Sequence, residues 1–391
     1  MIESARRLDK IPPYLFAEIS ALKRKAISEG KDLIDFGIGD PDQPTPAPII
    51  DALNAAAHDP STHRYDETPA GWIPFLEAVS IWFKRRFGVD IDAERESMLL
   101  IGSKEGLAHL AWAYIDPGDL AICPDPSYTV PRVNTLLAGG EVYSLPLLEE
   151  NEFLPDLNSI PEHILSRARI LWLNYPNNPT AAIASLQFYR EAVRLAHEYN
   201  LLLVNDAAYS NVYYDDPPPS ILQVEGAKEV AVELHSLSKM FNMTGWRIGF
   251  AVGNPEAIAA INRLKSNLDS KQFPAVSLAA AYALLYGDNS ATISLYRKRR
   301  DILCDGLNKL GWKVRKPEAA IYVWTRVPQG QTSSGFARRL LEEASVNVIP
   351  GSGYGEFGEG YVRMSLTVMG DKHGERIEQA VQRIGVVLRS L

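Results

Sequence analysis

The chain has 391 residues, of which 46% are hydrophobic and 23% are charged, and its formal net charge at pH 7 is -8. This length exceeds what one hydrophobic core usually supports, so we expect a large domain and a smaller one. The negative net charge argues against nonspecific binding of nucleic acid. The two cysteines, Cys123 and Cys304, cannot form a disulfide framework, and the charged N-terminal residues do not fit a secretory signal, so the expected location is cytoplasmic.

The N-terminal part of the chain is predicted to contain a helix, a short strand and a stiff loop. Residues 13–30 have a helical pattern that ends at Gly30. An apolar strand within residues 32–36 then leads into a loop with four prolines, Pro41, Pro44, Pro46 and Pro48. Residues 63–88 are typical of a loop followed by an amphipathic helix.

A regular alternation of short apolar segments and helical patterns begins at about residue 97. Helical patterns such as those of residues 104–114 and 186–199 separate most of the apolar segments. We interpret seven segments as strands, at residues 98–101, 120–123, 142–145, 170–173, 201–205, 230–234 and 248–252. Near-continuous apolar strands alternating with helices predict an α/β fold with a mostly parallel sheet that is covered on both faces.

The last third of the chain has a different pattern and is predicted to be a smaller α+β domain. Residues 273–310 are mainly helical, and strands and helices alternate after them. We therefore expect an N-terminal segment at residues 1–45 that packs with the small domain, a large domain at 46–285 and a small domain at 286–391. Gly353, Gly355 and Gly358 match the spacing G-x-G-x-x-G, but a strand pattern follows them, so a tight turn is expected instead of a dinucleotide site.

Ligands of open α/β sheets bind beyond the carboxyl ends of the strands, so the residues that follow each strand are the candidates for a site. Ser103 and Lys104 begin a helix there, and free N–H groups at a helix N-terminus attract phosphate. Ser103 fits the simpler role of a helix cap equally well. Ser236, Ser238 and Arg247 would add hydroxyl donors and a guanidinium, which completes a phosphate cup.

Four further residues at strand ends carry groups that suit a planar cofactor. Asp206 ends an apolar strand, either as a helix cap or as the partner of a protonated ring nitrogen, since a buried carboxylate needs a cation or a donor. Asn178 lies in the turn Asn174–Thr180, and Tyr128 is either a packed side chain or a stacking platform. Lys239 lies between two strands, where it is either a surface lysine or an amine that traps a carbonyl.

Together these groups are what pyridoxal phosphate requires. Asp206 would keep the pyridine nitrogen protonated, so that the ring accepts electrons. Lys239 would hold the aldehyde as a Schiff base and move a proton between the substrate Cα and the cofactor C4′, as general base and then as general acid.

Four motifs, NYPNNPT, NDAAY, HSLSKMFNMTGWRIGF and YVRMSL, carry a resemblance to a known family. In their order and spacing the chain resembles the fold-type I pyridoxal-phosphate enzymes, the class I/II aminotransferases, over essentially its whole length. The resemblance implies a ping-pong exchange of an amino group between an amino acid and a 2-oxo acid. It also implies that Lys239 bears the cofactor, that Asp206 contacts the ring nitrogen, that Asn178 and Tyr209 contact the 3-oxygen and that Tyr128 stacks on the ring. The phosphate would be held by Ser103, Lys104 through its backbone, Ser236, Ser238 and Arg247.

The same resemblance implies how substrate and partner are bound. Arg363 would clamp the α-carboxylate of the substrate, and the backbone of Gly39 would meet the same group. Tyr65 would reach the phosphate of a neighbouring subunit, so a homodimer with shared active sites is expected. Tyr128 and Asn178 are expected to border the substrate as well, and no metal, nucleic acid or membrane is expected as a partner.

Within this family, five segments are most similar to the LL-diaminopimelate aminotransferases, namely YLFAEI, GIGDPDQPTP, GSKEGLAHL, PDPSYTV and SNLDSKQF. Those enzymes exchange an amino group between 2-oxoglutarate or glutamate and tetrahydrodipicolinate or LL-diaminopimelate. Tyr14, and Glu67 of the partner subunit, are the candidates for binding the distal end of such a substrate, although both also fit solvated loop positions.

Several positions depart from the family pattern. Ala181 and Lys271 stand where glycine is usual, Pro131 replaces a tyrosine, and Met240 with Phe241 replaces a Thr-Tyr pair. Three alternatives therefore remain in this sequence analysis: an aminotransferase for alanine, aspartate or another amino acid, a carbon–sulfur lyase of the same fold, and a non-catalytic ligand-binding regulator. Such a regulator would carry an added DNA-binding domain.

Overall fold

The computed structural model describes residues 3–11 and 17–391. The predicted N-terminal helix corresponds to α1 (Ala17–Ser28), and the part of the prediction that falls on residues 13–16 lies outside the described residues. The helix ends as expected, with Gly30 in the left-handed region at a φ of 72°. Among the described residues, no helix is both long and apolar enough to span a membrane.

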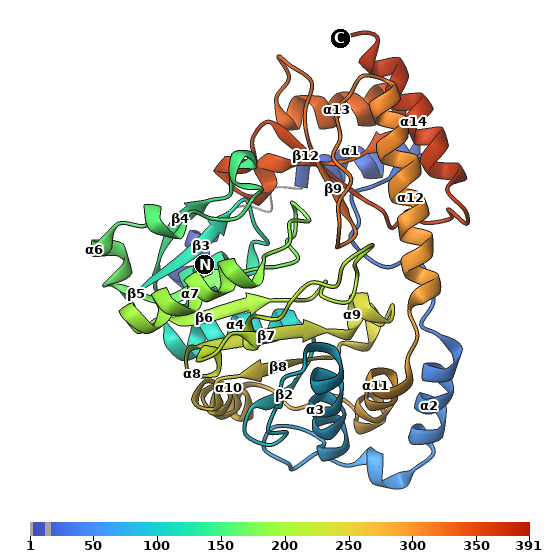
Figure 1. The fold of residues 1–391 in the computed structure, drawn as a ribbon. Coiled ribbons are helices and arrows are strands. Elements are labelled where there is room, and N and C mark those ends of the chain that lie inside the picture. The colour runs from blue at the N-terminus through green and yellow to red at the C-terminus, as the bar shows by residue number, and fades with distance from the viewer. Residues whose placement is uncertain (1–2, 12–16) are drawn as a thin grey trace.

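A seven-stranded sheet forms the centre of the molecule, and all seven predicted strands belong to it (Figure 1). The strand order is β2-β8-β7-β6-β5-β3-β4, and only β8 runs antiparallel to its neighbours. The strands are β2 (Ser97–Leu100), β3 (Leu120–Asp125), β4 (Glu141–Pro146), β5 (Ala168–Leu173), β6 (Leu202–Asp206), β7 (Ala231–Ser236) and β8 (Gly249–Gly253). The prediction of a mostly parallel α/β sheet is thus confirmed.

Helices cover both faces of this sheet because its strands are apolar on both sides. Leu203 and Leu171 point into one core, and the alternate residues Val204 and Trp172 point into the other. The first core is shared with α3 (Ile73–Phe87), α7 (Leu186–Tyr199) and α11 (Pro274–Tyr286), and the second with α4 (Ser103–Tyr114), α5 (Val130–Ala138) and α10 (Pro255–Leu268). Shorter or peripheral helices are α2 (Ala47–Ala57), α6 (Glu162–Leu165), α8 (Ala227–Val230) and α9 (Leu237–Met240).

The C-terminal part forms a second layered unit above the sheet in Figure 1. It has a three-stranded antiparallel sheet in the order β11-β12-β9 and a small parallel pair, β1-β10. Its elements are β1 (Ile34–Asp35), β9 (Tyr322–Arg326), β10 (Val346–Asn347), β11 (Ile349–Pro350), β12 (Tyr361–Ser365), α12 (Ser290–Lys309), α13 (Ser333–Ala344) and α14 (Glu375–Leu388).

The long helical span expected at residues 273–310 consists of two helices. α11 ends at Tyr286 and α12 begins at Ser290. Asp288 accepts hydrogen bonds from the backbone N–H and the hydroxyl of Ser290, the first residue of α12, which is a local contact of the turn between the two helices. The glycine-rich segment of residues 351–358 forms two 3₁₀ turns before β12, as expected of a turn.

We propose the division into residues 1–45, 46–285 and 286–391 that the sequence indicates, and the hydrophobic cores support it. Ile34 and Phe36 of the N-terminal segment are buried together with Leu303, Val323 and Ile384 of the C-terminal unit. The two cores that flank the large sheet consist of residues between 49 and 284.

One buried guanidinium connects the N-terminal loop to the C-terminal unit. Arg299 of α12 has no exposed surface, and its Nη1 and Nη2 donate to the two carboxylate oxygens of Asp42 at 2.8 Å each. Its Nε donates to Asp371 at 2.7 Å, and Nη1 also donates to the carbonyl of Leu366. Such a fork of donors suits a bidentate carboxylate contact, and it leaves no buried charge without a partner.

We therefore predict that Arg299→Met lowers the stability of the fold strongly. The change leaves the carboxylates of Asp42 and Asp371 buried without their cation, a defect that costs about 3–5 kcal/mol in other proteins. Denaturant unfolding followed by circular dichroism measures it. Arg339→Met, which removes an exposed pair with Glu343, is the control and should leave the unfolding midpoint near that of the wild type. Equal midpoints for both variants would contradict the prediction.

Candidate active site

A cavity of about 400 Å³ lies at the carboxyl ends of the parallel strands, between the two sheets. Its lining contains most of the residues that the sequence indicates, which come from loops far apart in the chain. They are Gly39, Ser103, Lys104, Tyr128, Asn178, Asp206, Tyr209, Ser236, Ser238, Lys239, Arg247 and Arg363. Three other predicted residues are not among them. Tyr14 lies outside the described residues, and Tyr65 and Glu67 lie elsewhere on the surface.

Lys239 lies on α9, a single helical turn that connects the antiparallel strands β7 and β8. The hydroxyl of Ser236 caps this turn by accepting the backbone N–H of Ser238. The ammonium of Lys239 donates to the carbonyl of Gly39 at 2.7 Å. Burial lowers the pKa of Lys239 to about 8; the carboxylate of Asp40 opposes this shift, and two guanidiniums, of Arg363 and Arg247, add to it. A lysine in this state is a better nucleophile at neutral pH than a surface lysine.

Asp206 ends β6 with its side chain only 6% exposed. The backbone N–H of Ala208 supports one part of the carboxylate, but its Oδ1 has no hydrogen-bond partner among the described residues. Burial raises the pKa of Asp206 to about 7. The alternative of a helix cap is wrong, because a turn and not a helix follows this residue. A buried carboxylate oxygen without a donor, in the wall of a cavity, fits a ligand that brings a cationic N–H.

The N-terminus of α4 forms the anion-attracting end of the cavity. Its N-cap residue is Gly102, at a φ of 80°, so the alternative that Ser103 caps the helix is wrong. Arg247 precedes β8 and donates from Nη1 to the carbonyl of Thr244 at 2.8 Å. A Cβ atom added to Gly102 would lie 2.7 Å from Nη2 of Arg247, so only glycine lets the guanidinium approach the helix end. Free helix N–H groups, two hydroxyls and a guanidinium are a donor set that suits a phosphate.

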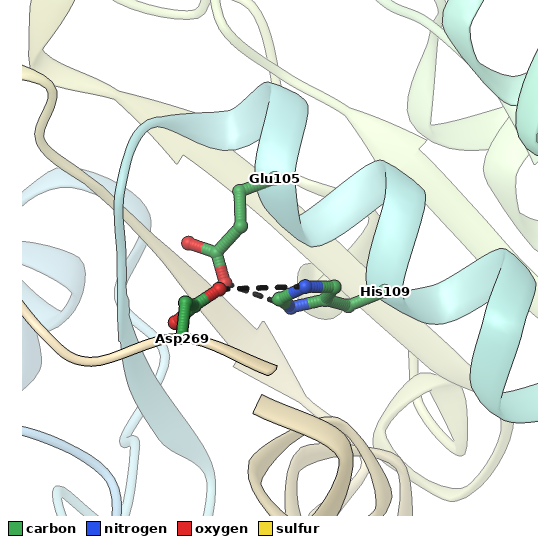
Figure 2. Close-up of side chains that lie close together, drawn as sticks. All are labelled: Glu105, His109 and Asp269. Atoms are coloured by element: carbon green, nitrogen blue, oxygen red, sulfur yellow. Dashed lines mark ion pairs between the residues drawn. The ribbon is translucent and has the colours of Figure 1, made fainter. Parts of the chain in front are cut away.

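A buried ionic cluster turns the one acidic side chain of this helix end away from the cavity. The carboxylate of Glu105 accepts the backbone N–H of Ile101 and lies 2.8 Å from Nδ1 of His109 and 3.0 Å from Nζ of Lys265. Figure 2 shows Glu105, His109 and Asp269 pointing toward one another. Lys265 also pairs with Asp269, so the two carboxylates already share a buried cation. Burial alone would raise the pKa of Glu105, but His109 and Lys265 lower it, which keeps the carboxylate charged.

Arg363 of β12 forms the opposite wall of the cavity. Its Nη1 donates to the side-chain oxygen of Asn178 at 3.1 Å, and its Nη2 donates to the carbonyl of Gly37 at 2.9 Å. The guanidinium lies over the ring of Tyr322, 4.1 Å from its centroid, and its Nε has no hydrogen-bond partner among the described residues. The phenol of Tyr322 is 2.7 Å from that of Tyr209. A guanidinium fixed in this way and still holding a free donor can bind a carboxylate.

Four lining residues with polar side chains were not identified as site residues in the sequence analysis, namely Asp40, Asn174, Thr244 and Tyr322. Tyr322 follows an apolar strand pattern that indicates packing and gives no sign of a site. Asp40 directly follows Gly39, and Asn174 begins the turn that contains Asn178. This closeness in sequence to identified residues was the only sign that they line the site.

A second buried pair lies beneath the cavity and was also missed as a functional feature. Glu233 and His235 of β7 are fully buried, with Oε1 and Nε2 2.8 Å apart. The other oxygen of Glu233 accepts from the side chain of Asn205 and from a backbone N–H at Ile221, and His235 contacts the hydroxyl of Ser210 at 3.1 Å. The pair thus connects β7 to β6, which ends at Asp206, and to the turn that carries Tyr209. A complete set of partners makes its burial tolerable.

Tyr65 and Glu67 lie on a larger and more open depression of about 1310 Å³, whose lining residues fall within 61–72 and 262–274. Tyr65 is 85% exposed, and Glu67 is exposed as well. A single chain therefore does not bring these two residues to Lys239. Size alone would favour this depression as the site. The groups with shifted pKa values, Lys239 and Asp206, and the guanidinium of Arg363 with its unpartnered Nε, line the smaller cavity instead.

Comparison with known proteins agrees with this geometry. The profile of the family "Aminotransferase class I and II" matches residues 31–384. The LL-diaminopimelate aminotransferase of Aquifex aeolicus is 49% identical over 387 residues, which cover 98% of this chain and 99% of the relative. The enzyme of the same name from Moorella thermoacetica is 48% identical over 390 residues, or 99% of each chain.

Solved structures lead to the same family. Substrate-bound BacF from Bacillus subtilis superimposes with a TM-score of 0.93 at 37% identity, over 99% of this chain and 98% of that one. Aspartate aminotransferase from Thermotoga maritima has a TM-score of 0.90 at 28% identity, over 99% of this chain and all of the other. A lysine with a lowered pKa opposite an unpartnered carboxylate, within a fold and a sequence shared with these enzymes over nearly their full length, shows that the chain belongs to the class I and II aminotransferases.

Proposed function

We propose that this pyridoxal-phosphate-dependent aminotransferase takes its amino group from LL-diaminopimelate and passes it to 2-oxoglutarate. The observation that carries the chemistry is the pair formed by Lys239 and Asp206 in one cavity, the first with a lowered pKa and the second with an oxygen that lacks a donor. The substrate is inferred from relatives about 48% identical over nearly the whole chain, all named LL-diaminopimelate aminotransferase.

The residues of the cavity fit pyridoxal phosphate. When bound, the cofactor supplies an aldehyde for the amines and an electron-withdrawing pyridine ring. Asp206 would pair with the ring N–H, which also restores a partner to its free oxygen. Tyr128 would stack on the ring, and Asn178 and Tyr209 would donate to its 3-oxygen. The phosphate would be held by Ser103, Lys104, Ser236, Ser238 and Arg247.

Lys239 would act both as the anchoring amine and as the group that moves the proton. Its contact with the carbonyl of Gly39 lies beside Arg363, the proposed clamp for the substrate α-carboxylate. A carboxylate on Arg363 would therefore lie close to the amine of Lys239, and the substrate Cα would be oriented for proton transfer. The same geometry would hold both the amino donor and the 2-oxo acceptor, as a ping-pong exchange requires.

A homodimer with shared active sites is part of this proposal. Tyr65 and Glu67 are exposed on an open depression away from their own Lys239, which supports delivery to a second copy of the chain. There Tyr65 would reach the phosphate, and Glu67 the distal end of the substrate. We also propose a cytoplasmic location, which the two free buried cysteines, Cys123 and Cys304, support.

A steady-state assay tests the substrate. Purified protein loaded with the cofactor should form glutamate from 2-oxoglutarate with LL-diaminopimelate at a higher kcat/KM than with alanine or aspartate. Lys239→Ala should lower kcat by roughly 10⁴-fold or more, because it removes the amine and the proton carrier together. Glutamate formed from alanine or aspartate but not from LL-diaminopimelate would assign the chain to that other substrate.

The lowered pKa of Lys239 predicts how its reaction with the cofactor depends on pH. Since burial moves this pKa from 10.5 to about 8, the neutral amine at pH 7 is about 300-fold more abundant than for an ordinary lysine. The rate at which the apoprotein captures pyridoxal phosphate should rise with pH up to about 8 and level off above it. Stopped-flow absorbance measures this rate, and Lys239→Ala is the blank. A rate still rising tenfold between pH 9 and pH 10 would contradict the shift.

Asp206→Asn should keep the shape of the cavity but remove the charge that faces the ring nitrogen. We expect kcat/KM to fall roughly 10²-fold or more, since electrostatic stabilisation in a water-poor site is usually worth this much. Asp215→Asn, at an exposed carboxylate paired with Arg297, is the control and should leave kcat/KM unchanged. An Asp206→Asn enzyme with wild-type kcat/KM would rule out the proposed role.

A further inference from the structure

The loop that carries Tyr65 and Glu67 alternates between outward and inward side chains. Tyr65 and Glu67 are exposed, whereas the side chain of Asp66 between them is only 3% exposed. Thr68 also turns inward, where its hydroxyl donates to the carbonyl of Gly71 at 2.6 Å and its backbone N–H donates to Asp66 at 3.0 Å. The backbone of this loop is therefore fixed from within on both sides of Glu67, while the side chains of Tyr65 and Glu67 remain exposed.

The inward residues are held by one lysine from a distant part of the chain. The ammonium of Lys271 donates to the backbone carbonyl of Asp66 at 3.0 Å and to that of Thr68. It lies 3.6 Å from the carboxylate of Asp66. The side chain of Lys271 is 14% exposed, so these contacts are shielded from water and replace most of its hydration.

The backbone around Lys271 is itself anchored. Asp269, two residues earlier, pairs with Lys265, which also pairs with Glu105 in the first turn of α4. Figure 2 shows Asp269 beside Glu105 and His109. Gln272, one residue later, donates to the carbonyl of Leu100 at 3.2 Å. Lys271 therefore connects the loop to a rigid part of the large domain.

We propose that Lys271 is a positioning residue that fixes Tyr65 and Glu67 for the active site of a second copy of this chain. The inference rests on the homodimer in the proposed function. Lys271 acts through the loop and has no contact with its own Lys239 cavity. The nearest partners of its ammonium are the backbone carbonyls of Asp66 and Thr68, and the carboxylate of Asp66 lies farther away. The ammonium, and not this carboxylate, is therefore the group that fixes the loop.

Backbone hydrogen exchange in the cofactor-free protein gives the first test. Lys271→Met keeps the length of the side chain but loses all three donors, and should speed exchange of the amides of residues 65–71 about tenfold or more, with unchanged exchange in α7. Asp66→Asn keeps a side-chain acceptor for Thr68 and the two backbone carbonyls that Lys271 binds. It should therefore change the exchange of these amides little. If Lys271→Met does not fold, Lys271→Gln replaces it. Unchanged exchange in the lysine variant, or an equal effect of both variants, would overturn the proposal.

Mixed dimers test whether Lys271 acts on the partner. The Lys271→Met dimer should bind pyridoxal phosphate about tenfold more weakly by equilibrium dialysis, because Tyr65 no longer meets the phosphate in one orientation. In a dimer of one Lys271→Met chain and one Lys239→Ala chain, the first chain keeps Lys239 and the second keeps Lys271. The site that contains Lys239 therefore receives the intact loop of the second chain. One site of this dimer should recover wild-type affinity and kcat/KM.

The outcomes separate the two proposals. If light scattering finds the wild-type protein to be a monomer, the homodimer proposal fails and the inference fails with it. If the protein is a dimer but the mixed dimer keeps the weakened affinity at its intact Lys239, Lys271 acts within its own chain, and only the inference is overturned.

Discussion

The geometry of the site depends on four consecutive backbone carbonyls, those of residues 36–39, which all accept hydrogen bonds from elsewhere in the chain. The backbone N–H of Ser365 donates to the first, Arg363 to the second, the hydroxyl of Thr367 to the third and Lys239 to the fourth. The loop thus lies between β12 and Lys239, and it closes the cavity from the side of the C-terminal unit. Two glycines make this approach possible. A Cβ atom on Gly37 would lie 2.5 Å from the side chain of Asn347, and one on Gly39 would overlap the phenol of Tyr322.

Burial has opposite effects on the charges of the two central groups, and both effects favour the chemistry. It disfavours the ammonium of Lys239, which makes the amine available, and it disfavours the carboxylate of Asp206, which makes a cationic partner valuable. The buried cations Arg299 and Lys265 differ from these two groups, because each forms ion pairs with two carboxylates. Among the described residues, Asp206 and Arg363 thus each keep one atom without a partner in the wall of the cavity, where a ligand can complete it, whereas Arg299 and Lys265 are paired with carboxylates that support the fold.

Residues outside the cavity divide into two supporting sets. The Glu233–His235 pair connects β7 to β6 and to the turn that follows β6, and the Glu105–Lys265–Asp269 cluster connects the N-terminus of α4 to the segment that holds Lys271. The second set lies next to the loop of the exposed Tyr65 and Glu67, which lie away from the Lys239 cavity of their own chain. The proposed dimer gives these two residues a function. Their proposed positioning depends on Lys271, which stands where the sequence analysis expects glycine.

The local pattern of the chain was enough to predict the seven strands and to single out Lys239 and Asp206, which line one cavity, whereas Arg363 was identified only through the family resemblance. Apolar periodicity reports which segments are buried, and parallel strands bring their carboxyl ends to one edge, so residues that follow separate strands converge. The break between α11 and α12, the capping of α4 by Gly102, and the roles of Tyr322 and Lys271 could not be predicted in this way. The first two are local features that the apolar pattern does not register, whereas the roles of Tyr322 and Lys271 depend on contacts between residues far apart in the sequence: Lys271 meets Asp66 across 205 positions and Tyr322 meets Tyr209 across 113. Only folding decides which distant side chains become neighbours, and the burial that shifts the pKa values of Lys239 and Asp206 arises from that same packing.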